Sequence, residues 1–236
     1  MEELRRLKAL LSHGGSSVPF IVNIEIIRLF AALAFGSGSE NELGGYLFGR
    51  RGHVGSDIAN VCIHVDAVIV PDQVGGPDSF EDTDAGCEQL SAATAKVEDR
   101  QRTMVGWIHT HPKQTTCLSS IDMHTVRRHL LSFSAHIVKP ILSKPLLGSQ
   151  QARLQAEVGP GFIAIVLAPR DPQPQRIEAG IKLGVYTLTP ETVGLVNACR
   201  RRGFHDCVGK YQDARHVVFS ENTAVSPICI NLRGTS

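Results

Sequence analysis

Three histidines and one aspartate, all residue types that bind metal ions, occur within the segment HTHPKQTTCLSSIDMH at positions 109 to 124. His109 and His111 stand two residues apart at the end of the apolar run MVGWI. Because successive side chains of a strand alternate between its two faces, both histidines should point the same way and hold one ion. The spacing therefore predicts a metal site at the C-terminal mouth of a buried strand.

The aspartate and the last histidine of the segment should serve different sites. Asp122 and His124 lie in SSIDMHTVRRHLL, a pattern that predicts a helix begun by a capping serine. Each helical residue turns by about 100°, so side chains two positions apart diverge by about 200°. The turn after Pro112 can bring Asp122 back to the histidine pair, and His124 is then expected to face elsewhere.

Two imidazole nitrogens and one carboxylate oxygen form an open zinc site, with the fourth position left for water. Zinc lowers the pKa of that water toward about 7 and polarises a bound carbonyl group. Hydrolysis also needs a base and a donor for the oxyanion, and Ser119, three residues before Asp122, is a candidate donor. Taken singly, each residue has a plainer explanation: a chance His-x-His, a capping serine, or an aspartate that complements a helix dipole. Their combination favours the zinc site.

Strands and helices mix along the chain and must position these residues. Helices are predicted over 22–34, over the polar segment that follows the acidic loop 71–84, and from Ser119 onward; strands are predicted over 44–50, 61–70, 104–111, 161–169 and 183–188. A hairpin is expected at 50–57, and the segment 134–160, with prolines, glycines and no sustained period, is expected to be an inserted surface loop. The pattern indicates an α/β sandwich around a mixed sheet.

Composition narrows the class of protein. With 236 residues, of which 42% are hydrophobic, the chain can bury one full core. The net charge of +1 gives no basic surplus that would indicate nucleic acid or an anionic membrane as partner. The start MEELRRLKALL lacks the apolar region of a signal peptide, and no apolar run is long enough to span a bilayer. We therefore expect an intracellular protein, in which six cysteines favour metal binding or burial over disulfides.

The segment HTHPKQTTCLSSID resembles the signature of the JAMM (MPN-plus) metalloproteases, which is His-x-His-Pro, a spacer and Ser-x-x-Asp. The resemblance implies a cytidine-deaminase-like α/β fold, with a central mixed sheet sandwiched by helices. It also implies that His109, His111 and Asp122 bind the catalytic zinc and that Ser119 stabilises the oxyanion. The general base of the family precedes the glycine of the first strand, and ELGGYLFG matches that pattern at Glu42 rather than Glu40.

Within this family the chain is similar to the AMSH branch of deubiquitinases. The resemblance rests on GWIHTHPKQT, CLSSIDMHT, GPD at 76–78 and CRRRGFH near the end, and it implies a catalytic domain over 22–233, after an N-terminal segment 1–21 and interrupted by the loop 134–160. That branch carries two insertions and a second, closed zinc site. The residues that correspond to this site are His124, Cys199, His205 and Cys207.

Cys207 stands where the branch has a histidine, but cysteine is an equally good zinc ligand, and a Cys₂His₂ set remains tetrahedral. The chain is thus expected to hold two zinc ions. The alternative is that Cys199 and Cys207 are ordinary thiols. The other four cysteines, for which no such ligand set is visible, are expected to be buried apolar residues: Cys62, Cys87, Cys117 and Cys229.

The branch implies a polyubiquitin substrate of the lysine-63 linkage type. Its first insertion, near residues 71–98, would contact the distal ubiquitin, and Thr115 and Phe204 would touch the proximal ubiquitin. Core packing beside the zinc explains Phe204 equally well. Competing hypotheses are a JAMM isopeptidase for another linkage or another ubiquitin-like modifier, and a non-catalytic MPN scaffold.

The branch further implies a cytoplasmic, endosome-associated protein with an endosomal sorting adaptor as partner. A long N-terminal targeting domain is expected in AMSH proteins, and only about twenty residues precede the first predicted helix. Either the chain is a fragment, or the protein reaches endosomes through its partner.

Overall fold

The computed structural model describes residues 19–36, 38–53, 61–98, 102–133, 162–188, 211–221 and 226–234. One mixed sheet runs in the order β10-β9-β7-β6-β2-β3-β1-β11, with β12 paired to β3 and β8 paired to β9. Its strands are β1 (Phe20–Asn23), β2 (Gly44–His53), β3 (Val61–Val70), β6 (Thr103–Thr110), β7 (Ile163–Leu167), β8 (Arg176–Glu178), β9 (Ile181–Leu188), β10 (Tyr211–Asp213), β11 (Val217–Ser220) and β12 (Ile228–Asn231).

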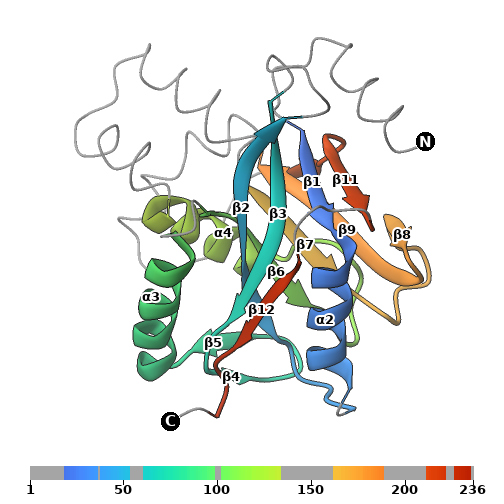
Figure 1. Cartoon of the computed structure of the whole chain (residues 1–236). Coiled ribbons are helices and arrows are strands. Elements are labelled where there is room, and N and C mark those ends of the chain that lie inside the picture. Colours follow the sequence, from blue (N-terminus) through green and yellow to red (C-terminus); the bar gives the residue numbers. More distant parts are fainter. Residues whose placement is uncertain are drawn as a thin grey trace, which may run out of the picture.

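Helices cover both faces of this sheet (Figure 1). Helix α2 (Ile24–Phe35) packs on one face and buries Ile27 and Phe30 in a core with the inward side chains of β1 and β3. Helices α3 (Asp84–Glu98) and α4 (Ser120–Phe133) contribute Leu90 and Met123 to a second core on the other face. The expected α/β sandwich around a mixed sheet is confirmed.

Strand β6 lies near the middle of the sheet and carries the histidine pair. It pairs with β2 in antiparallel and with β7 in parallel orientation. All its residues after Thr103 are buried, which explains the continuous apolar run in its sequence. Trp107 belongs to the core under α3 and α4, so His109, two residues further on, faces the same side as these helices.

Two expectations for the first half of the chain were wrong. The helix predicted over 22–34 begins at Ile24, because Phe20–Asn23 form the buried strand β1 and the Asn23 side chain caps the helix by accepting from the Glu25 N–H. The predicted acidic loop 71–84 contains a small hairpin of β4 (Gln73–Gly75) and β5 (Phe80–Asp82). Its strands are too short and polar to show a period in sequence.

Phe80 fixes the hairpin against the sheet. A Cβ atom added at Gly44 would collide with the Phe80 ring, and that ring lies 5.7 Å from the Trp107 ring, centroid to centroid. A glycine at position 44 thus lets the hairpin lie over the end of β2. This contact brings the GPD segment, residues 76–78, beside the histidine pair.

The other predicted elements are present with shifted ends. The hairpin of β2 and β3 is antiparallel as expected, and α3, β6, α4, β7 and β9 overlap the predicted segments. The sequence reading missed β8, β10, β11 and β12, and the inserted loop 134–160 lies outside the described residues. Cys62 is buried as expected and Cys229 is half-buried, but Cys87 and Cys117 are exposed, which corrects their predicted burial. No helix in the described ranges is long and apolar enough to cross a membrane.

Candidate metal centre

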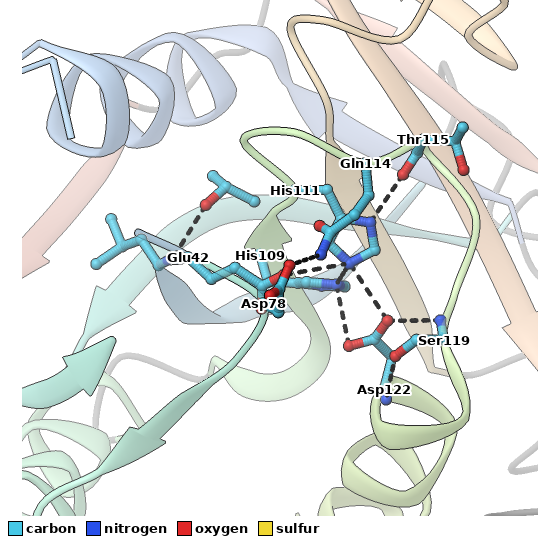
Figure 2. Close-up of polar contacts among 10 residues, drawn as sticks. Glu42, Asp78, His109, His111, Gln114, Thr115, Ser119 and Asp122 are labelled. Carbon is cyan, nitrogen blue, oxygen red and sulfur yellow. Dashed lines mark hydrogen bonds and ion pairs between the residues drawn. The ribbon is translucent and has the colours of Figure 1, made fainter. Parts of the chain in front are cut away.

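His109, His111 and Asp122 converge where β6 ends and α4 begins, and one ligand atom from each lies within 4.8 Å of the others. The two Nε2 atoms are 3.0 Å apart, and each lies 3.3 Å from an oxygen of the Asp122 carboxylate. Figure 2 shows the three side chains pointing toward one another. All three are at least 95% buried, so a cation there would be held away from bulk water.

The ring of His111 is oriented by the loop that follows it. Its Nδ1 lies 2.7 Å from the carbonyl oxygen of Thr115. A carbonyl can only accept, so Nδ1 carries the proton and Nε2 keeps the lone pair that points at the cluster. Hydrogen bonds of this kind fix metal-binding histidines in proteins. Thr115, predicted to touch ubiquitin, is exposed and has this backbone role as well.

His109 is held by packing. It has no exposed surface, and its ring stacks on Trp107 with centroids 4.0 Å apart and planes 18° apart. Burial lowers the pKa of His109, because the charged imidazolium is disfavoured away from water. Burial also opposes protonation of His111, but its hydrogen bonds with Asp122 and Thr115 outweigh this effect and raise its pKa.

Ser119 and Asp122 cap the first turn of α4 reciprocally. The Asp122 carboxylate accepts from the Ser119 N–H at 2.6 Å, and the Ser119 Oγ accepts from the Asp122 N–H at 3.1 Å. This capping box fixes the carboxylate toward the histidines and places the Ser119 hydroxyl beside them. Burial alone would raise the pKa of Asp122, but contacts with both histidines and Ser119 hold it well below its usual range.

Glu42 lies beside the cluster, with Oε1 3.8 Å from the Nε2 of His111. Its N–H donates to the Gly76 carbonyl at 2.7 Å, and the next residue, Leu43, exchanges hydrogen bonds with Thr110 at the end of β6. Burial raises the pKa of Glu42 to about 7. Glu40, by contrast, is exposed and forms ion pairs with Lys113 and Arg170.

Gln114 joins the loop after His111 to the β4–β5 hairpin, a contact that sequence reasoning missed. Its Nε2 donates to the Asp78 carboxylate at 2.7 Å (Figure 2). Its side chain also hydrogen-bonds Glu42. The GPD motif that contains Asp78 was recognised in sequence, but a role for the aspartate requires knowing that the hairpin folds over the site. Gln114 therefore ties together the two segments that flank Glu42.

The second predicted ligand set is only partly described. His124 is buried at 3% exposure in α4, two residues after Asp122, and does not belong to the three-residue cluster. The remaining ligands predicted for that site, together with the expected ubiquitin contact Phe204, lie outside the described residues: Cys199, His205 and Cys207.

The donor atoms of the described cluster fit zinc. Four-coordinate zinc holds nitrogen and oxygen ligands at roughly 2.0–2.2 Å in a tetrahedron, which places neighbouring donors about 3.3 Å apart. The separations in the cluster are 3.0, 3.3 and 3.3 Å. Three such ligands, with the Glu42 carboxylate 3.8 Å from the His111 Nε2, match the donor set of a catalytic zinc site.

A protein-family model matches the part of the chain that holds this site. The family model described as JAB1/Mov34/MPN/PAD-1 ubiquitin protease matches residues 25–129, the stretch from α2 into α4 that holds the cluster and Glu42. An Arabidopsis thaliana protein named AMSH-like ubiquitin thioesterase 3 is 29% identical over 157 residues, or 65% of the chain and 23% of the relative. The human AMSH-like protease is 31% identical over 138 residues, or 58% of the chain and 22% of the relative.

A Xenopus laevis relative named STAM-binding protein-like is 34% identical over 139 residues, or 58% of the chain. The matched stretch is 24% of that relative, so the chain spans less than a quarter of the length of each of these three curated relatives.

Proposed function

We propose that the chain is a zinc-dependent deubiquitinase of the JAB/MPN family, because the family model matches residues 25–129 and the similar proteins named above are AMSH-like. It hydrolyses isopeptide bonds in polyubiquitin. The observation that carries the proposal is the convergence of His109, His111 and Asp122 beside the buried carboxylate of Glu42.

The residues around the cluster divide the hydrolytic chemistry among them. His109, His111 and Asp122 would hold the zinc ion, which when bound acidifies a water molecule and polarises the scissile carbonyl. Glu42 takes the proton of the attacking water and returns it to the leaving lysine amine. Ser119, whose Oγ lies 3.1 Å from the Asp122 backbone nitrogen at the start of α4, donates a hydrogen bond from its hydroxyl to the developing oxyanion.

The proposed substrate class rests on the resemblance to the AMSH branch. We infer lysine-63-linked chains as the substrate, with the distal ubiquitin on the β4–β5 hairpin and α3 and the proximal ubiquitin near Thr115 and Phe204. Val74 of the hairpin is 70% exposed, as a contact residue for a protein substrate should be. A panel of linkage-defined diubiquitins tests this assignment, because equal cleavage of other linkages or of another modifier would replace it.

A second zinc ion would be held by His124, Cys199, His205 and Cys207. The support is the position of His124 in α4, where helical geometry turns it away from Asp122, and the tetrahedral set that the four residues would complete. Elemental analysis is expected to give two zinc ions per chain. One zinc per chain would contradict the second site.

A sorting adaptor at endosomes is the proposed partner. The Xenopus relative is named for binding STAM, and the AMSH resemblance implies an endosome-associated cytoplasmic enzyme. Pull-down of the full chain with purified STAM tests the interaction, and absence of binding at micromolar concentration would reject it.

Replacement of Glu42 tests the hydrolytic assignment. Glu42→Gln preserves the shape of the side chain but cannot accept a proton, so kcat for chain cleavage should fall by about 10²- to 10⁴-fold. Glu40→Gln is the matched control, because Glu40 lies two residues away and in the described part of the chain forms ion pairs with the exposed Lys113 and Arg170. It should retain wild-type cleavage. Full activity of the Glu42 variant would reject the mechanism and favour a non-catalytic scaffold.

A further inference from the structure

A buried carboxylate that the proposed mechanism does not use lies behind the loop that follows the histidines. Asp171, between β7 and β8, is 2% exposed. Its Oδ2 accepts from the Thr116 N–H at 2.7 Å, and its Oδ1 accepts from the Gln173 N–H at 2.9 Å. Both carboxylate oxygens are thus used to hold backbone N–H groups.

The Thr116 N–H and the Thr115 carbonyl belong to one peptide group, and both of its ends are engaged. The carbonyl accepts from the His111 Nδ1 at 2.7 Å, while the N–H donates to Asp171 at 2.7 Å. A peptide group is a rigid plane. A contact that fixes its N–H therefore also fixes the direction of its carbonyl, and with it the ring of His111.

We propose that Asp171 is a positioning residue for the metal ligand His111 and acts through the Thr115–Thr116 peptide. This inference rests on the proposed zinc site. The negative charge of Asp171 polarises the peptide, which makes the Thr115 carbonyl a stronger acceptor for the His111 Nδ1–H. A stronger hydrogen bond there makes His111 Nε2 a better donor to a metal ion, as a carboxylate bound directly to a ligating histidine does.

The loops around Asp171 and Thr116 are also held by contacts that do not involve the Asp171 carboxylate. The proposed orienting role can therefore be separated from simple anchoring of these loops. The Asp171 N–H donates to the Ala168 carbonyl at 3.1 Å, and the Lys182 Nζ donates to the Asp171 carbonyl at 2.8 Å. The Gln175 N–H lies 3.4 Å from the Thr116 Oγ1. Each of these contacts survives removal of the carboxylate, so its loss should act on the orientation of the peptide.

Zinc affinity of the full chain, measured by competition with a chelator, tests the proposal. Asp171→Ala should weaken zinc binding at the His111 site by roughly 10- to 100-fold. Asp171→Asn keeps an acceptor for the Thr116 N–H without the charge, so it should weaken binding less, and it provides the measurement if the alanine variant does not fold. Lys182→Met is the matched control: it removes the ammonium group that donates to the Asp171 backbone carbonyl but keeps both contacts of the Asp171 carboxylate, so zinc affinity should stay at the wild-type value.

A second readout follows the hydrogen bond directly. The Nδ1–H resonance of His111, assigned from its absence in His111→Ala, should be protected from exchange in the wild type and exchange faster in Asp171→Ala. Wild-type zinc affinity and wild-type exchange in both Asp171 variants would overturn the inference, as would an equal loss of affinity in Lys182→Met. If His111→Ala itself leaves zinc binding intact, the failure lies in the proposed zinc site.

Discussion

Two strands of the sheet carry rows of potential metal ligands, and only one row forms a cluster. His109 and His111 at the end of β6 meet Asp122 of α4 within 4.8 Å. Strand β3 carries Cys62, His64 and Asp66 at alternate positions, so it too presents metal-binding residue types two positions apart on one strand. In the described part of the chain this second row does not form a three-ligand group.

The two rows differ in the side chains that surround the carboxylate of Asp66 and that of Asp122. Asp66 is bound by Arg102 through two hydrogen bonds, at 2.7 and 3.0 Å, and Arg50 lies 3.4 Å away. Arginine cations occupy the oxygens that a metal ion would need. Asp122 lies beside two histidines, which can be neutral, so in the described part of the chain no permanent cation neutralises its charge. Residue type and spacing are thus insufficient, because the charge of the surrounding side chains decides which row can bind metal.

The remaining residues of the β3 row reinforce this contrast. The Cys62 Sγ lies 3.2 Å from the His64 Nε2, and burial raises the pKa of the Cys62 thiol to about 11. Burial and the nearby Arg50 lower the pKa of His64. Since the thiolate is the metal-binding form, burial makes the deprotonation that a metal ligand needs less favourable at Cys62.

The largest expected effect comes from removing one ligand of the β6 cluster. His109→Ala should lose one zinc ion per chain and all measurable cleavage of diubiquitin, because two ligands do not hold zinc in a catalytic geometry. Chelation of the wild-type chain should abolish cleavage in the same way, with recovery on addition of zinc. Elemental analysis and a diubiquitin assay measure both quantities, and unchanged zinc content in His109→Ala would refute the assignment of the cluster.

Breaking the ion pair between Arg102 and Asp66 should destabilise the fold without changing zinc binding at the β6 cluster. Arg102→Met leaves Asp66 buried without its main partner, and such losses cost about 3–5 kcal/mol in the free energy of unfolding. Arg50→Met should cost much less, because the Arg50 side chain is 37% exposed. Urea denaturation of the two variants measures the difference, and zinc content should stay at the wild-type value in both. Equal stability of the two variants would contradict the contrast drawn between the partners of Asp66.

Sequence reasoning predicted the β6 cluster because periodicity is local: a strand ending in His-x-His and a helix beginning with Ser-x-x-Asp specify the direction of their own side chains. It could not predict the partners that come from distant segments. The β4–β5 hairpin is anchored by Phe80 against Gly44, and Asp171 reaches Thr116 across 55 positions. The strands β10, β11 and β12 were missed for the same reason, since their short sequences become strands only by pairing with β9, β1 and β3.

Ser119→Ala separates the structural and chemical roles of this serine. Loss of the hydroxyl removes the cap of α4, which should cost about 1 kcal/mol in unfolding free energy. If Ser119 also donates to the oxyanion, kcat should fall by about 10²- to 10³-fold. Ser119→Thr keeps a hydroxyl at the cap and should recover most of the stability. A kcat that stays at the wild-type value in Ser119→Ala would leave Ser119 as a helix cap alone.

The smallest effect is expected at the β3 row. His64→Gln replaces a potential ligand on β3 that is half-buried and contacts Cys62. His64 does not belong to the three-ligand cluster at the end of β6. Zinc content and cleavage rate should both equal those of the wild type, because neither the Cys62 thiol nor the arginine-bound Asp66 offers a partner for an ion. Loss of a zinc ion in this variant would mean that the β3 row binds metal despite its arginines, and that the charge surrounding a row of ligands does not decide whether it forms a site.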